Sequence, residues 1–375
     1  MRNKLYGDGI NDDAAAIQEM LDTGTSEVRL PPPAVRYMIG RTLKIHSNQS
    51  LILPRFAAIR LMDGVSRPMI ENAGFKVGDE NIRVSGGVWD MNNVGQAPNP
   101  IYNLEFKKYY DVETAVNPNP YFPDVYLGVG MRFANIKNLE LSDLTYKDPV
   151  TFCTEMAHLD GFTVEKIIFD FNQGNPYPLN MDGIHLEGHC RHGVIRDLKG
   201  TCYDDLVALN ADELCRGPIE DIVIENIMAE NCHSAVRLLS SCSPVRRINI
   251  SRVFGTYYQY CVAFSKYFRK GDGNPGVYED IAIKDCCVSK AERNVDFYKN
   301  SYVYPLFWFE SETYSKNVTF RDISRVEKTT DVPMIRLEKD AKIENLTFDN
   351  VRQESELFPE LVLVDNLGEI VNGYL

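Results

Sequence analysis

A short apolar pattern recurs along the chain and restricts the folds that the chain can adopt. Its form is apolar-x-apolar-x-x-apolar, and its start-to-start steps run from 23 residues (139 to 162) to 37 residues (281 to 318). Alternate apolar residues are typical of a strand with one buried face, and the two-residue step marks a bend after which the inward face resumes. The seven clearest copies begin at Leu139, Phe162, Ile222, Ile248, Ile281, Val318 and Leu346, with a weaker copy at Gly193.

These copies predict a coil that stacks on itself. One strand–bend–strand unit of about 25 residues cannot bury its inner face alone, but neighbouring units in register can. Long helical periodicity is nearly absent, which disfavours folds of alternating strands and helices. We therefore expect an all-β chain that forms a single-domain right-handed parallel β-helix over residues 1–375; an all-β sandwich is the alternative. The residue before the last apolar position is often Asp or Asn, as at Asp143, Asp197, Asn226, Asp285, Asp322 and Asn350.

Two segments depart from the repeat. Residues 12–21 predict a short helix, because Asx residues stand at its start and Ile17, Met20 and Leu21 form one apolar stripe. Such a helix would cap the open N-terminal end of the stack, which otherwise exposes core and unpaired strand edges. Residues 91–130 are rich in proline and tyrosine, and we interpret them as a long inserted loop rather than a separate domain.

Charge limits the kinds of partner. The chain has 53 acidic and 40 basic residues and a net charge of -13, which repels nucleic acid and anionic membrane surfaces. No segment approaches the roughly 18 to 20 uninterrupted apolar residues that a membrane span needs. We therefore expect neither nucleic acid nor a membrane as a partner. The pattern leaves the oligomeric state open.

The N-terminus and the cysteines bear on location. The first twelve residues have no apolar stretch of the kind that secretory signals carry, so we expect a cytoplasmic protein if Met1 is the native start, and secretion remains open otherwise. The nine cysteines are scattered and form no C-x-x-C pair. This favours reduced thiols packed in a core over disulfides or a zinc site.

Three aspartates carry the chemical signal. Asp182 precedes Asp204 and Asp205 by about one coil, and equivalent positions on adjacent coils lie roughly 4.8 Å apart. We expect the three carboxylates to cluster on one outer face. Like charges this close raise at least one pKa, which supplies the general acid beside an ionised base that glycoside hydrolysis needs. Turn residues or a calcium site would explain the same residues.

Several motifs resemble known families. Residues 6–13 followed by Ala16-Ile17-Gln18 resemble the N-terminal signature of pectin-lyase-like β-helix enzymes. Between about 135 and 210, Asn180-x-Asp182-Gly183 followed by Asp204-Asp205-x-Val207-Ala208-Leu209-Asn210 resembles glycoside hydrolase family 28, the polygalacturonases. This resemblance implies inverting hydrolysis of pectin-type or other acidic oligosaccharides without a metal or other cofactor. It implies Asp204 as the general acid, with Asp182 and Asp205 positioning and activating water.

The substrate-binding candidates stand close to these motifs. His185 alternates with inward residues and is expected to point outward beside Asp182, either contacting sugar or solvated. The Gly-His-Gly of the family is replaced by Cys232-His233-Ser234, and alignment of the inward residues puts Ser234 at the position of its histidine. Its later Arg-x-Lys is also absent. The remaining candidates are Asn180, Arg237 and Lys266. Arg237 is expected either to bind a uronate or to neutralise the charge of the aspartates.

These observations predict an exo-acting glycoside hydrolase of an oligosaccharide or polysaccharide. Exo action is expected because a loop at 91–130 would close one end of the cleft. Two other functions are compatible with the same fold. A polysaccharide lyase would need a cation, often calcium, and an Arg or Lys base. A non-catalytic glycan-binding β-helix would need no acid–base pair.

Overall fold

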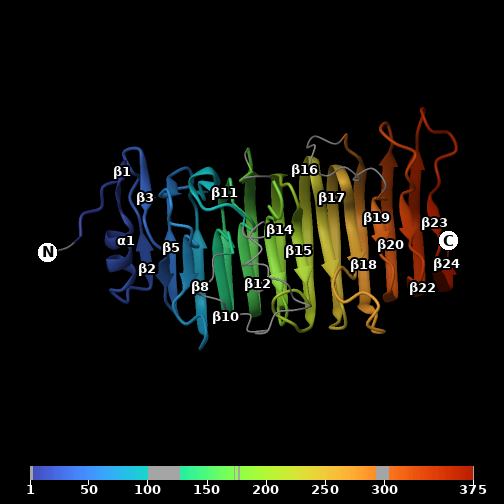
Figure 1. Cartoon of the computed structure of the whole chain (residues 1–375), viewed down its shortest axis with the longest axis horizontal. Helices are drawn as coiled ribbons and strands as arrows, with labels where there is room; N and C mark the ends of the chain where they lie inside the picture. The colour runs from blue at the N-terminus through green and yellow to red at the C-terminus, as the bar shows by residue number, and fades with distance from the viewer. Residues whose placement is uncertain (1–2, 100–126, 173, 176–177, 293–303, 375) are drawn as a thin grey trace.

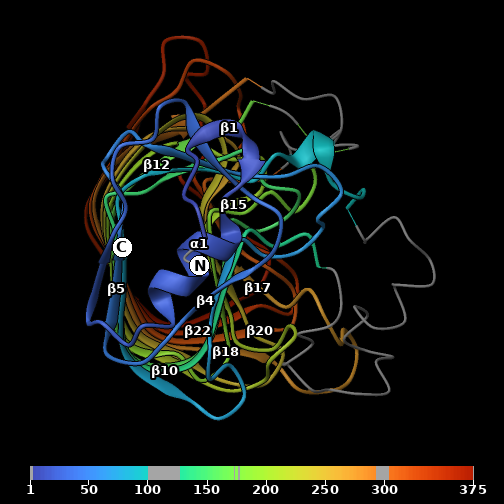
Figure 2. The same cartoon turned by 90° about the vertical axis from the view of Figure 1, so that its left-hand side faces the viewer.

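The computed structural model describes residues 3–99, 127–172, 174–175, 178–292 and 304–374. Its strands belong to one stacked sheet system in which every recorded pairing is parallel. Successive coils follow one another along the long axis of the molecule from the N-terminus to the C-terminus (Figure 1). Seen from the N-terminal end, the coils enclose a single interior (Figure 2). The right-handed parallel β-helix predicted from the repeat is confirmed.

The strands vary from three-residue segments to long bent strands that turn a corner of the coil. The N-terminal coils contain β1 (Asp8–Asp12), β2 (Glu27–Arg29), β3 (Arg36–Ile39), β4 (Leu43–Ile45), β5 (Gln49–Ile52), β6 (Ala58–Leu61), β7 (Ile70–Asn72), β8 (Asp79–Ser85) and β9 (Val88–Asp90). The central coils contain β10 (Met131–Ser142), β11 (Thr145–Lys147), β12 (Thr154–Asp170), β13 (Ile184–Glu187), β14 (Arg191–Thr201), β15 (Asp205–Asn210) and β16 (Ile219–Leu239). The C-terminal coils contain β17 (Val245–Ser265), β18 (Gly276–Lys290), β19 (Phe307–Phe309), β20 (Thr313–Val326), β21 (Ile335–Leu337), β22 (Lys342–Glu354), β23 (Val364–Asn366) and β24 (Glu369–Tyr374).

The repeat copies are aligned one above another. Leu139 pairs with Phe162, Phe162 with Gly193, and Gly193 with Ile222. The alignment continues through Ile248, Ile281, Val318 and Leu346. These residues, apart from Gly193, belong to one continuous buried apolar cluster that runs through the interior. Each copy therefore buries its inner face against the copies before and after it, as the pattern predicted.

The Asp and Asn residues of the repeat form the bends. Asp143, Asp197, Asn226, Asp285, Asp322 and Asn350 all have φ between 53° and 60°. This left-handed conformation is unfavourable for most L-residues, but Asp and Asn tolerate it because their short polar side chains bond locally. Asn226 also donates a side-chain hydrogen bond to Asp197 on the preceding coil. The bend residues thus explain why a two-residue step recurs in the apolar pattern.

The predicted cap is present and is shorter than expected. Helix α1 (Ala14–Leu21) lies across the N-terminal opening of the stack (Figure 2), and Ala14, Ile17 and Leu21 are fully buried. It begins two residues later than the predicted 12–21 because Asp12 ends β1. The carboxylate of Asp12 accepts a hydrogen bond from the Ala14 amide (2.8 Å), and this contact satisfies one of the free amides at the start of the helix.

The inserted segment expected at 91–130 is described only at its two ends. A 3-10 helix (Asn93–Gly95) follows β9, and residues 127–130 lead into β10. Residues 100–126 lie outside the described residues, and the prediction of a cleft-closing loop falls mainly on them. Among the described helices, none has the length and apolarity to cross a membrane. All nine cysteines are free; seven of them are buried, and Cys242 and Cys287 are exposed.

Candidate active site

The three predicted aspartates come together at the ends of neighbouring strands. Gly183 donates its amide to the carbonyl of Asp205 (3.0 Å), and Ile184 pairs with Val207 in the next coil. Asp182 is therefore aligned with Asp205, and Asp205 with Ser234 one coil further on. Asp204 precedes this column by one residue. The predicted cluster is formed, and Asp205 rather than Asp204 is the residue in register with Asp182.

Asp205 is surrounded by hydrogen-bond donors. Its Oδ1 accepts hydrogen bonds from the hydroxyls of Ser234 (2.6 Å) and Tyr260 (2.9 Å). Its Oδ2 lies 3.5 Å from a guanidinium nitrogen of Arg237. The side chain is only 2% exposed. Two hydroxyls and a guanidinium therefore fix the orientation of this carboxyl group.

Asp204 has contrasting surroundings. One carboxyl oxygen, Oδ2, accepts a hydrogen bond from the Asn180 amide (3.1 Å), and the other, Oδ1, lies 3.8 Å from Nδ1 of His233. Burial raises the pKa of Asp204 well above its usual value, and the charges of Asp182 and Asp205 raise it further. The side chain keeps 15% of its surface exposed. Asp204 is thus a carboxyl group that favours its protonated form and still reaches solvent.

Asp182 is paired with a buried imidazole. Its Oδ2 lies 2.7 Å from Nδ1 of His185, and burial raises the pKa of Asp182 to about 6 against the opposing effect of that contact. His185 has no exposed surface, and its ring stacks on Phe152 with the ring centres 3.8 Å apart. Burial opposes the charged imidazolium, but the contacts with Asp182 and Glu187 outweigh it and raise the pKa of His185 well above its usual value. His185 lies beside Asp182 as predicted, and it points out of the coil, because its neighbours Ile184 and Leu186 belong to the interior apolar cluster and His185 does not. It is not solvated, however, because Phe152 covers one face of its ring.

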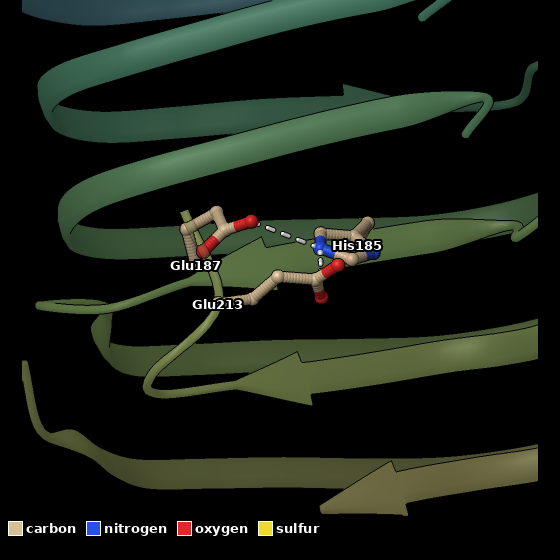
Figure 3. A group of neighbouring side chains, drawn as sticks. All are labelled: His185, Glu187 and Glu213. Atoms are coloured by element: carbon tan, nitrogen blue, oxygen red, sulfur yellow. Dashed lines mark hydrogen bonds and ion pairs between the residues drawn. The ribbon is translucent and has the colours of Figure 1, made fainter. Parts of the chain in front are cut away.

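The far side of His185 faces two further carboxylates. Its Nε2 lies 3.1 Å from Oε1 of Glu187 and 3.5 Å from Oε2 of Glu213 (Figure 3). Burial raises the pKa of both glutamates. The ligating atoms of these three residues lie within 4.8 Å of one another, as do those of Asp204, Asp205 and His233. Both groups therefore have the donor types that bind metal ions.

The remaining candidates divide into two sets. Arg237 lies at the site: its Nε donates to Ser265 (3.1 Å), its guanidinium lies over the ring of Tyr267, and its side chain is 20% exposed. His233 is buried, which lowers its pKa to about 4, and its Nδ1 lies 2.8 Å from the hydroxyl of Ser234. Lys266 has no exposed surface, because its ammonium binds Asp272 and Glu312 (2.8 Å each). The ammonium of Lys266 is thus occupied by two carboxylates, and its predicted role in substrate binding stays a prediction.

Sequence reasoning missed three residues that complete the site. Tyr260 bonds Asp205 directly, while Glu187 and Glu213 surround His185. Glu187 could have been found from its position two residues after His185 on one strand, which puts both side chains on one face. Glu213 follows β15 in a turn, and no periodicity indicates where such a residue points.

Comparison with known proteins gives the fold. No family model matches the sequence, and no curated protein sequence matches it. Solved structures similar to the chain include an endo-xylogalacturonan hydrolase from Aspergillus tubingensis (15% identity, 97% of each chain, TM-score 0.62). They also include a family 28 exopolygalacturonase from Yersinia enterocolitica (14% identity, 99% of this chain and 77% of that chain, TM-score 0.59).

Two similar structures are proteins of other kinds. One is the tailspike protein of an E. coli bacteriophage in complex with a hexasaccharide (13% identity, 99% of this chain and 62% of that chain, TM-score 0.71). The other is a surface adhesin of Streptococcus pneumoniae (14% identity, 99% of this chain and 97% of that chain, TM-score 0.57). At these identities the likeness shows the parallel β-helix fold, which hydrolases, a tailspike and an adhesin share.

Proposed function

We propose that this protein is a glycoside hydrolase that cleaves an acidic oligosaccharide or polysaccharide with inversion at the anomeric carbon. The observation that carries the proposal is the contrast between two adjacent carboxyl groups. Asp204 is partly exposed and favours its protonated form, while Asp205 is buried among donors and beside a guanidinium. A proton donor beside an ionised base is what glycosidic cleavage requires.

In this mechanism Asp204 protonates the glycosidic oxygen of the leaving group. The backbone amide of Asn180 donates a hydrogen bond to Oδ2 of Asp204, so Oδ1 is the oxygen that carries the proton toward the substrate. The low pKa of His233 keeps its ring neutral near pH 7, so His233 adds no positive charge that would favour loss of that proton. Asp205 and Asp182 act as bases toward the attacking water.

The contacts of Arg237 support an acidic substrate. Its guanidinium stands beside Asp205 with one fifth of the side chain exposed. An Arg fork binds a carboxylate through charge-assisted hydrogen bonds, which are stronger than neutral contacts with a sugar hydroxyl. Tyr267, over which the guanidinium lies, is 62% exposed and offers a ring face to a sugar. Exo action stays a prediction from the sequence.

The test is the release of reducing ends from a panel of defined uronate and neutral oligosaccharides. We expect the wild type to cleave a uronate substrate and proton NMR to show an inverted anomer as the first product. Asp204→Asn removes the transferable proton and is expected to abolish turnover, and Asp205→Asn is expected to lower it by roughly 10²-fold or more. Asp349→Asn, which changes an exposed carboxylate of β22 paired with Arg321, is the matched control and is expected to leave turnover unchanged.

The same assay separates the other functions. A product that absorbs in the ultraviolet, because a double bond has formed, would identify a polysaccharide lyase. Oligosaccharide binding that persists when Asp182, Asp204 and Asp205 are each replaced by Asn, with no reducing ends released by the wild type, would identify a glycan-binding β-helix. Unchanged turnover in Asp204→Asn would move the general acid to another residue.

A further inference from the structure

Behind Asp182 lies a closed group of polar side chains that the proposed hydrolysis does not use. The group consists of His185, Glu187, Glu213 and Asn210, and we call it the His185 cluster (Figure 3 shows its three titratable members). His185 and Glu187 have no exposed surface, and Asn210 and Glu213 are 2% and 7% exposed. Polar groups this deeply buried need partners that satisfy all of their charges and lone pairs.

The distances from His185 to the other members of the cluster are close to the edges of a coordination tetrahedron, whereas Asn210 and Glu213 are closer together and share a hydrogen bond. Nε2 of His185 lies 3.1 Å from Glu187 Oε1, 3.5 Å from Glu213 Oε2 and 3.4 Å from the side-chain nitrogen of Asn210. Four ligands bound about 2.0 to 2.1 Å from a tetrahedral ion lie about 3.3 to 3.4 Å from one another. Small movements of these side chains would therefore place all four around one ion.

Asn210 brings a buried acceptor without a partner to the edge of the cluster. Its Oδ1 is buried and has no hydrogen-bond partner among the residues that the structure describes. Its Nδ2 points into the cluster, toward His185 and Glu213. Rotation of the carboxamide by half a turn would bring Oδ1 to the position of Nδ2, next to a carboxylate oxygen. Two acceptors can face each other there only if a cation lies between them.

The surroundings hold the ligands in the orientation that metal sites use. Nδ1 of His185 lies 2.7 Å from Asp182, so Asp182 retains the Nδ1 proton, and Nε2 is the nitrogen directed into the cluster, where a bound ion would displace its proton. Oε2 of Glu187 accepts the backbone amides of Leu214 (2.9 Å) and Cys215 (3.0 Å), which leaves Oε1 for a ligand. A carboxylate on the far nitrogen and fixed ligand oxygens are the usual outer shell of protein metal sites.

The donor types also indicate the kind of ion. Imidazole with carboxylate oxygens suits Zn²⁺ and similar transition-metal ions better than Ca²⁺ or Mg²⁺.

We propose that the His185 cluster binds one divalent transition-metal ion, preferentially Zn²⁺, through His185, Glu187, Glu213 and Asn210. The ion is structural: it ties β13 to the end of β15 and to the turn that follows it, directly behind the catalytic carboxylates. It takes no part in hydrolysis, and the proposal stands whether or not the chain is a hydrolase. The cysteine pattern argued only against a cysteine-based zinc site, and this site uses none.

The first test is metal content. The protein is unfolded in denaturant with a chelator, refolded with or without Zn²⁺ as the only metal, and freed of excess metal. Mass spectrometry of the metal is expected to give one zinc per chain, and zinc is expected to raise the melting temperature. Wild-type protein that folds but retains no stoichiometric zinc overturns the proposal.

Matched variants locate the ion. Glu213→Gln is expected to lose the bound zinc and the zinc-dependent rise in melting temperature. Asp204→Asn, which alters the neighbouring group of Asp204, Asp205 and His233, is expected to keep both. The opposite result would place the ion at the neighbouring group and overturn the assignment. Asp182→Asn is expected to weaken zinc binding by about 10- to 100-fold, because it disrupts the contact that orients His185.

A spectroscopic measurement decides the case if the variants fail to fold. Wild-type protein refolded with Co²⁺ is expected to show the strong visible absorption of a tetrahedral site. A weak spectrum typical of octahedral, mostly hydrated Co²⁺ contradicts a site with four protein ligands. These readouts do not depend on glycosidase activity, so failure of the metal site and failure of the proposed function are distinguishable.

Discussion

Asp204 and Asp205 are adjacent in the sequence, but their surroundings assign them different chemistry. Asp205 accepts hydrogen bonds from two side-chain hydroxyls and faces the guanidinium of Arg237. Asp204 receives one backbone amide and lies in the field of Asp182 and Asp205, so its neutral form is favoured. Neighbouring groups with opposite preferences are the usual basis of an acid–base pair at neutral pH. This difference has a measurable consequence for stability.

We expect Asp204→Asn to make the protein more stable at neutral pH while abolishing turnover. The folded pKa of Asp204 is raised, so its contribution to stability is complete below the unfolded pKa of about 4 and is lost as the pH rises through the folded pKa. The neutral amide of the variant avoids that loss. Thermal unfolding at several pH values is expected to show a higher melting temperature for the variant at about pH 7 and little difference at about pH 3. A variant less stable than the wild type at neutral pH would contradict the raised pKa.

Arg237 tests the charge of the substrate. We expect Arg237→Ala to lower kcat/KM for a uronate substrate by an amount that corresponds to about 2 to 3 kcal/mol of transition-state binding. We expect a smaller loss for the matching neutral sugar, because it has no carboxylate for Arg237 to bind. The remaining loss arises because Arg237 also lies beside Asp205, and its removal disturbs that base. Steady-state kinetics on the two substrates measures both losses. Equal losses would assign Arg237 only to offsetting the aspartates.

At the scale of single coils, the bends explain how strands of different length share one register. Each corner of this type has a residue with positive φ, which is Asp or Asn in six of the eight repeat copies and Lys166 or Arg252 in the other two. The side chains of these residues also bond from coil to coil, as from Asn350 to Asp322 (2.6 Å). The bend is thus both a local conformation and a contact between neighbouring units.

We expect Asn226→Ala to destabilise the protein by about 1 to 2 kcal/mol, because alanine has a Cβ that disfavours the left-handed conformation and no amide for Asp197. Asn226→Gly relieves the backbone cost and is expected to recover part of this loss. Urea denaturation provides the free energies. Lys199→Ala, a change at an exposed strand position of β14, serves as the control with an expected effect within about 0.5 kcal/mol. An alanine variant as stable as the control would show that the bend does not require Asx.

The whole molecule is a stack in which each coil contacts mainly its two neighbours. The most extensive strand contacts join consecutive coils, such as β16 with β17 and β17 with β18. Stability in such a protein is close to a sum of units and interfaces, so damage at one end propagates weakly. Helix α1 protects the N-terminal end, where the first coil would otherwise expose its core.

We therefore expect Ile17→Ala to act locally. Loss of this buried side chain from α1 weakens the cap by about 2 to 5 kcal/mol. Hydrogen exchange is expected to show faster exchange in β1, β3 and β6, which pair in sequence from the N-terminal end, and little change in β16 to β18. Uniformly faster exchange along the chain would show instead that the whole stack unfolds as one unit.

The sequence alone predicted the fold because the signal is local and repeated. Alternation of apolar residues defines the inner face. Because the same spacing returns in each copy, it also defines which residues of neighbouring coils pair with each other. The pairing of Leu139 with Phe162 and of Ile222 with Ile248 follows directly from that spacing. The grouping of Asp182, Asp204 and Asp205 follows from the same register.

Only the tertiary structure decided what covers the outward side chains. Periodicity assigns His185 and Lys266 to a face, but burial on that face depends on neighbours brought in from other coils and from turns. Phe152 on the preceding coil and Glu213 in a turn enclose His185, while Glu312 on a later coil and Asp272 in a loop bind Lys266. Turns have no repeating pattern, so the partners they supply, and with them the protonation of the site, are determined only when the coils are stacked.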